Sequence, residues 1–132
     1  MSSTTRAMAL RALRVSEKDV QYEIVTLLRS IGAAVYVLGT KRARGDVQGT
    51  RQTPGISDLY CLLPAPRLSS GHACGVWIEV KAEGGQLRPE QHEFRRHCIA
   101  AGVPHVVGGT NEVVEFLSDG GWLKGVKRSV TA

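Results

Sequence analysis

The sequence lacks long apolar runs and has few cysteines, and both features restrict the classes of protein to which it can belong. No stretch of its 132 residues approaches the length of a membrane-spanning helix, and the N-terminus lacks the apolar core of a secretory signal. Its 3 cysteines, Cys61, Cys74 and Cys98, are an odd number without zinc-finger spacing. The neighbouring His72 and His97 do not complete such a pattern. We therefore expect a cytoplasmic, intracellular protein with reduced cysteines.

Acidic residues are outnumbered by basic ones. The chain has 12 Asp and Glu against 17 Lys and Arg, which gives a formal net charge of +5 and favours a polyanionic partner. Its length and its 42% of hydrophobic residues fit one domain with a single core. We expect this domain at residues 16–123, between a basic N-terminal arm at 1–15 and a basic C-terminal tail at 124–132.

Hydrophobic spacing and turn residues predict an α/β (α+β) fold. The expected elements are a helix between Ser16 and Gly32, strands at 33–38, 56–63 and 75–81, a helix from Pro89 to Gly102, a strand at 103–107 and a last helix capped by Thr110. In the first helix, Glu17 and Gln21 are expected to extend the buried stripe. In the second helix, Gln91 shares an inward face with Phe94, Cys98 and Ala101. The order predicts a mixed central sheet flanked by helices.

Two carboxylates and a lysine are the leading candidates for a catalytic site. Asp58 interrupts an apolar strand near its start, and Glu79 and Lys81 lie on one face of the next strand. A hairpin between these strands would bring Asp58 and Glu79 to the same end of the sheet. Paired carboxylate oxygens suit Mg²⁺ or Mn²⁺, which can activate a water molecule against a phosphodiester. Lys81 could orient that water or offset charge on the phosphate.

The wider arrangement resembles a known family. The matching segments are Ser16-Glu17-Lys18-Asp19-Val20-Gln21, Pro54-Gly55-Ile56-Ser57-Asp58-Leu59, Ile78-Glu79-Val80-Lys81-Ala82-Glu83-Gly84-Gly85-Gln86-Leu87 and Pro89-Glu90-Gln91. They resemble the virus-type replication-repair nuclease domain (VRR-NUC), a branch of the PD-(D/E)xK nuclease superfamily. The resemblance covers the chain from Ser16 to about Leu117 and implies a restriction-endonuclease-like core.

The resemblance also implies roles for individual residues. Glu17 would be a third metal ligand beside Asp58 and Glu79, and the carbonyl of Val80 would complete the coordination. Gln91 would hydrogen-bond a ligand or water. Gln21 and Gly55 would support the site.

A segment rich in Gly, Lys and Arg precedes Asp58 and is expected to form a loop beside the site. Together with the start of the second helix it supplies the candidate phosphate contacts, which are Lys41, Arg42, Arg44, Arg51 and Arg88. The alternative is a solubilising surface without a binding role. Clustering near the carboxylates favours nucleic-acid contact.

The function that this resemblance implies is a metal-dependent endonuclease that hydrolyses DNA and selects branched structures, such as a four-way junction or a flap. The chain as given shows no second domain that would choose a substrate, so a two-fold homodimer on junction DNA is a hypothesis. Two other functions stay open: a non-catalytic nucleic-acid-binding module on a nuclease scaffold, and an RNA or defence nuclease.

Each site residue also has a plainer interpretation. Asp58 could cap a turn after Pro54-Gly55, and Glu17 could only complement the helix dipole. Glu79 and Lys81 could form a solvated strand face. Gln91 could be an ordinary first-turn helix residue.

Overall fold

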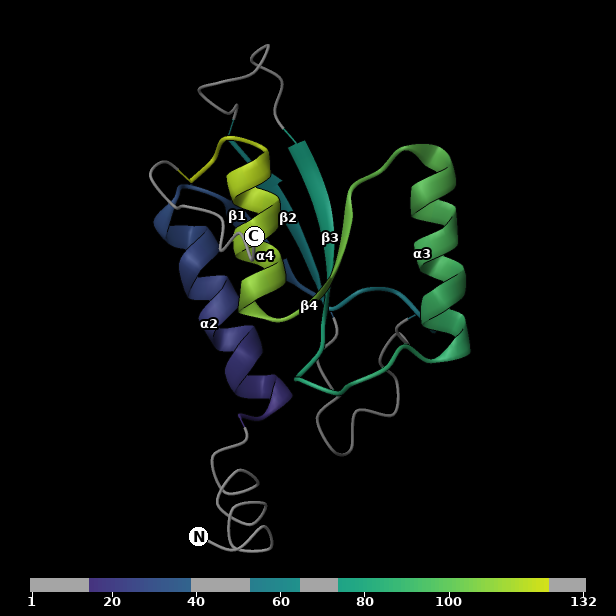
Figure 1. The fold of residues 1–132 in the computed structure, drawn as a ribbon. Coiled ribbons are helices and arrows are strands. Elements are labelled where there is room, and N and C mark those ends of the chain that lie inside the picture. Colours follow the sequence, from purple (N-terminus) through teal and green to yellow (C-terminus); the bar gives the residue numbers. More distant parts are fainter. Residues whose placement is uncertain (1–14, 39–52, 65–73, 124–132) are drawn as a thin grey trace, which may run out of the picture.

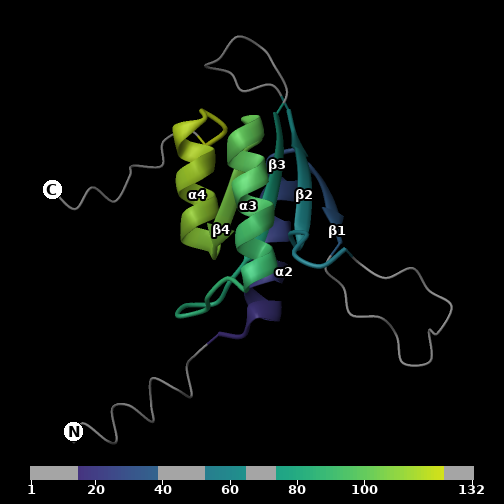
Figure 2. The same ribbon diagram turned by 90° about the vertical axis from the view of Figure 1, so that its right-hand side faces the viewer.

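The computed structural model describes residues 15–38, 53–64 and 74–123, and this part of the chain has a mixed α+β architecture. The elements are α2 (Glu17–Ser30), β1 (Ala34–Val37), β2 (Leu59–Leu63), β3 (Cys74–Val80), α3 (Pro89–Ala101), β4 (His105–Gly108) and α4 (Thr110–Asp119). The strands form one sheet in the order β1-β2-β3-β4. Helices α2 and α4 lie on one side of it and α3 on the other (Figure 1 and, turned by 90°, Figure 2). The expected mixed sheet flanked by helices is confirmed.

Strand pairing places the ends of β2 and β3 side by side. β1, β2 and β3 pair antiparallel, whereas β4 runs parallel to β3 after the crossover through α3. Leu59 is the register partner of Ile78. Because Asp58 precedes Leu59 and Glu79 follows Ile78, the antiparallel register brings the two acids to one end of the sheet, as the sequence predicted.

Helix α2 begins and ends where its sequence signals predict. Ser16 is the N-cap, and its Oγ accepts a hydrogen bond of 3.2 Å from the backbone N–H of Asp19. The helix ends before Gly32. The expectation that Glu17 extends the buried stripe is wrong, because Glu17 is exposed and the fully buried residues of α2 are Ile24 and Leu28. Glu17 opens the helix, so its side chain projects beyond that stripe.

The apolar core lies between the sheet and the pair α2 and α4. Its fully buried members include Ile24, Leu28, Leu59, Ile78, Val80, Val113 and Leu117. Burial of each large side chain of this kind stabilises a fold by about 1.5–3 kcal/mol. This layer holds β2 and β3 in place, and Asp58 directly precedes β2 while Glu79 lies in β3. None of the described helices combines the length and apolarity needed to cross a membrane.

Helix α3 confirms the expected inward direction of Gln91 and Cys98, which are both buried. Its C-cap is Gly102, which has a left-handed φ of 72°. Ala101 was expected on the same inward face but is exposed. It occupies the last helical position, where the chain already turns away from the sheet.

The last strand begins two residues later than predicted, whereas the last helix begins one residue earlier. The strand expected at 103–107 runs from His105 to Gly108. Pro104 has no N–H, so it contributes only its carbonyl, which accepts from Trp77 N at 3.1 Å. Thr110 is not the N-cap of α4: that position belongs to Gly109, and Thr110 is the first helical residue. Glu112 Oε1 accepts from Gly109 N at 2.7 Å and so takes over the capping role.

Candidate metal centre

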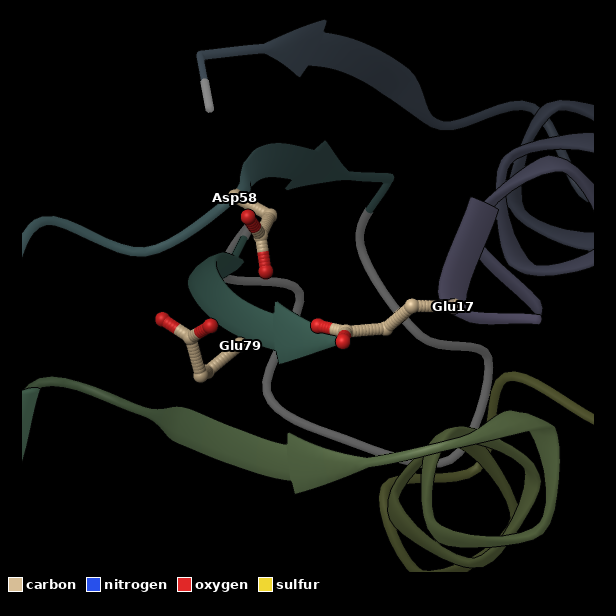
Figure 3. A group of neighbouring side chains, drawn as sticks. All are labelled: Glu17, Asp58 and Glu79. Carbon is tan, nitrogen blue, oxygen red and sulfur yellow. The ribbon is translucent and has the colours of Figure 1, made fainter. Parts of the chain in front are cut away.

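Three carboxylates converge at the end of the sheet. Glu17 comes from the first turn of α2, Asp58 from the residue before β2 and Glu79 from β3, and Figure 3 shows their side chains pointing toward a common region. One carboxylate oxygen of each lies within 4.8 Å of the others. In the described part of the chain no other group of three His, Cys, Asp or Glu side chains has this arrangement. The structure therefore brings together the three acids singled out in the sequence.

The Asp58 carboxylate is held against β3. Its Oδ2 accepts a hydrogen bond of 2.8 Å from the backbone N–H of Val80, and its backbone carbonyl accepts one of 2.7 Å from Leu38 N. A turn-capping aspartate would bond its own turn instead. The observed contact of Val80 is made through its N–H, and metal coordination by its carbonyl stays a prediction.

Glu79 is a buried acid that is only partly compensated. Its residue is 2% exposed, which excludes the solvated-face interpretation. Oε2 accepts from Gln91 Nε2 at 3.2 Å and lies 3.7 Å from Lys81 Nζ, whereas Oε1 is buried without a hydrogen-bond partner. A buried oxygen of this kind is costly unless a proton or a cation reaches it.

The electrostatics of the site favour a proton on Glu79 when no metal is bound. Burial first, and then the neighbouring Asp58 and Glu17 carboxylates, raise the pKa of Glu79 from 4.5 to about 8, and the nearby Lys81 ammonium group opposes this rise. A cation could take the place of that proton. Three hard carboxylate ligands suit Mg²⁺ or Mn²⁺, so the residues present fit such an ion.

Gln91 connects the acid to the lysine. Its Oε1 accepts from Arg88 N at 2.8 Å and from Lys81 Nζ at 3.2 Å. Because both groups only donate, the amide nitrogen must face Glu79, which fixes its orientation. Gln91 is therefore both a helix-start residue that bonds the N-cap backbone and a member of the site.

Gly55 lets the segment before Asp58 approach α3 closely. Its φ is +86°, and a Cβ atom there would overlap with the backbone carbonyl of Glu90. Only glycine combines that conformation with that contact. The segment that carries Asp58 is thus packed on the first turn of α3.

Other predicted site residues are less closely involved. Gln21 is half-buried, one turn after Glu17 on α2. The Arg88 side chain is 69% exposed and lies 3.7 Å from a Glu90 oxygen. The predicted phosphate contacts at Lys41, Arg42, Arg44 and Arg51 lie outside the described residues, as does His72.

Three residues that sequence reasoning did not assign to the site form a hydrogen-bonded chain beside it. Ser57 Oγ lies 3.0 Å from His105 Nε2, and Arg95 Nη1 lies 2.9 Å from His105 Nδ1. The sequence contained one signal for this chain of residues: Ser57 is a second polar residue beside Asp58, where an apolar strand was expected to start.

A scan against protein-family models found no match, and searches of curated proteins and of solved structures found no similar protein.

Proposed function

We propose that the protein is a nuclease that depends on Mg²⁺ or Mn²⁺ and hydrolyses phosphodiester bonds in DNA, with a restriction-endonuclease-like core of the VRR-NUC type. The observation that carries the proposal is the convergence of Glu17, Asp58 and Glu79 within 4.8 Å, with an unpartnered buried oxygen on Glu79. The order of the described elements, with Gln91 and Lys81 joined to Glu79, supports it.

The residues divide the chemistry between them. A divalent cation held by Glu17, Asp58 and Glu79 would supply Lewis acidity, making a water molecule more acidic and offsetting phosphate charge. Lys81 places its ammonium group 3.7 Å from Glu79, where it can orient that water and stabilise negative charge developing on the phosphate. Gln91 restrains Lys81 and Glu79 together. Water is the nucleophile, so no side chain need form a covalent intermediate.

DNA is the proposed substrate because of the net charge of +5 and the resemblance to VRR-NUC domains. We expect branched DNA, a flap or a four-way junction, to be cut in preference to plain duplex. A homodimer would place two sites on opposed strands. Sedimentation at the working concentration tests the dimer, and a monomer that cuts junctions fully would contradict it.

The test is cleavage of labelled single strand, duplex, flap, four-way junction and an RNA strand, each with Mg²⁺, Mn²⁺ or EDTA. Wild type is compared with Asp58→Asn and Lys81→Ala. Glu93→Gln, which removes an exposed acid from α3 without touching the carboxylate group, is the matched control. We expect metal-dependent cleavage that both site variants lose and the control retains.

Other outcomes would reject the proposal in different ways. Tight DNA binding without cleavage under any metal would identify a binding module on a nuclease scaffold. Preferential cleavage of the RNA strand would identify a ribonuclease. Cleavage that survives Asp58→Asn would place the chemistry elsewhere in the chain.

A further inference from the structure

Ser57 directly precedes Asp58, one of the acids that would bind the metal. It is fully buried, and a buried hydroxyl needs a partner. That partner is His105 at the start of β4, 3.0 Å away. β4 is two strands removed from β2 in the sheet, so this bond ties the segment before β2 to the far side of β3.

The direction of the hydrogen bonds follows from Arg95. Its Nη1 is 2.9 Å from His105 Nδ1 and 3.2 Å from the His105 carbonyl. A guanidinium only donates, so Nδ1 must be the acceptor and the ring proton must be on Nε2. Nε2 therefore donates to Ser57 Oγ. Burial, and secondarily Arg95, lower the pKa of His105 to about 4, so the ring is neutral near pH 7.

This direction excludes a nucleophilic role for Ser57. A base that activates serine must accept the hydroxyl proton, and Nε2 already carries a proton. The hydrogen bond fixes the position of Ser57 instead. The adjacent Asp58 is then restrained from three sides, because Val80 N bonds its carboxylate and Leu38 N its carbonyl.

Helix α3 is thus connected both to β3, which carries Glu79, and to the segment before β2, which carries Asp58. Gln91 bonds Glu79, and Arg95, four residues later on the same helical face, bonds His105. Phe94 lies between these two and packs its ring against His105, with centroids 5.7 Å apart. The two connections start one turn apart on α3, and they end at Glu79 and at Ser57, the residue before Asp58.

We propose that Arg95, His105 and Ser57 form a positioning chain that sets the Asp58 carboxylate at the distance from Glu79 that one divalent cation requires. These are positioning residues, since none of them is placed on the metal or on a reacting atom. The inference rests on the proposed metal-dependent function. Partners that orient a ligand in this way typically raise metal affinity by about 10–100-fold.

The test is Mn²⁺ binding at pH 8 by calorimetry, with no nucleic acid present. Ser57→Ala and His105→Asn each remove the hydrogen bond between Ser57 and His105. Each should weaken Mn²⁺ affinity by about 10-fold or more. His105→Gln can place its amide nitrogen where Nε2 lies, so it should retain most of the affinity. Val113→Ala is the control, because it opens a cavity in the apolar core on α4, away from Arg95, His105 and Ser57. It should lower folding stability and leave Mn²⁺ affinity unchanged.

A second measurement reports on Asp58 without metal. The amide of Val80 donates to the Asp58 carboxylate, so its proton and nitrogen chemical shifts follow the position of that group. Ser57→Ala and His105→Asn should move this resonance in the metal-free protein, and Val113→Ala should not. If Ser57→Ala does not fold, the Asn and Gln variants of His105 decide the question.

The outcomes separate the two proposals. Wild-type Mn²⁺ affinity in Ser57→Ala and His105→Asn, with an unmoved Val80 resonance, would overturn the positioning chain and leave the proposed function intact. A wild type that binds no Mn²⁺ would reject the proposed function, while movement of the Val80 resonance in the variants would still support the positioning of Asp58.

Discussion

The two faces of the sheet are stabilised by different means. Toward α2 and α4 the contacts are apolar, and residues such as Leu28, Ile78 and Leu117 are almost completely buried. Toward α3 the buried residues include Glu79 and Gln91, which depend on directed hydrogen bonds. The first face can be filled by many apolar side chains of suitable volume. The second needs particular groups at particular distances, and the candidate chemistry lies there.

Neighbouring residues of β3 allow the sharpest comparison, because Ile78 and Glu79 point to opposite faces. Glu79→Gln should reduce cleavage by at least about 10³-fold, equivalent to about 4 kcal/mol of activation free energy, since it removes a metal ligand. Ile78→Val should cost about 0.5–1.5 kcal/mol of folding stability and leave cleavage nearly unchanged. Cleavage assays and urea unfolding measure the two effects. Equal losses of activity would contradict the division between the faces.

Gly55 tests how closely the Asp58 segment must approach α3. Gly55→Ala should destabilise the fold by about 3 kcal/mol, because backbone strain at positive φ adds to overlap with the Glu90 carbonyl. Gly84→Ala is the control: φ there is +83°, but nothing lies within 4 Å of the added Cβ atom. It should cost only about 1 kcal/mol. Similar unfolding midpoints for the two variants would show that the close approach does not matter.

The pH dependence of folding stability should reveal the buried Glu79 on the face of the sheet that packs against α3. The pKa of Glu79 is raised from 4.5 to about 8, so the folded chain keeps a proton that the unfolded chain loses between these values. Metal-free stability should therefore fall as pH rises toward 8, by roughly 1.4 kcal/mol between pH 7 and pH 9. Urea unfolding at both pH values measures this. The decrease should vanish in Glu79→Gln, and persistence there would assign it to another group.

The smallest effect is expected at the rim of the site. Arg88→Ala should change folding stability by less than about 0.5 kcal/mol, because its side chain is 69% exposed. If Arg88 contacts a phosphate, DNA affinity should fall for every sequence, and the salt dependence should decrease by about one unit of slope. Arg96→Ala, another exposed position on α3, is the control. Equal binding by wild type and Arg88→Ala would remove Arg88 from the interface.

Local signals in the sequence predicted much of the fold. Ser16 and Gly32 bound α2, and the paired apolar runs predicted the hairpin that joins Asp58 to Glu79. Boundaries were less predictable where tertiary pairing decides them. β4 extends to Gly108 because its carbonyl accepts from Lys81 N, a contact that the local sequence does not encode.

The candidate site was also predictable only in part. The three acids and Gln91 follow from their spacing and from the resemblance, and the structure brings them together. The exposure of Glu17 was not expected. The chain of Ser57, His105 and Arg95 was missed because its members are far apart in sequence and meet only when α3 packs on the sheet.

The most direct test of the central claim is a Mn²⁺ titration at pH 7 in two buffers with different ionisation enthalpies. If a cation takes the place of the Glu79 proton, about one proton should be released when Mn²⁺ binds. Asp58→Asn should abolish Mn²⁺ binding. Absence of Mn²⁺ binding would contradict the account. So would binding that releases no proton and persists in Asp58→Asn.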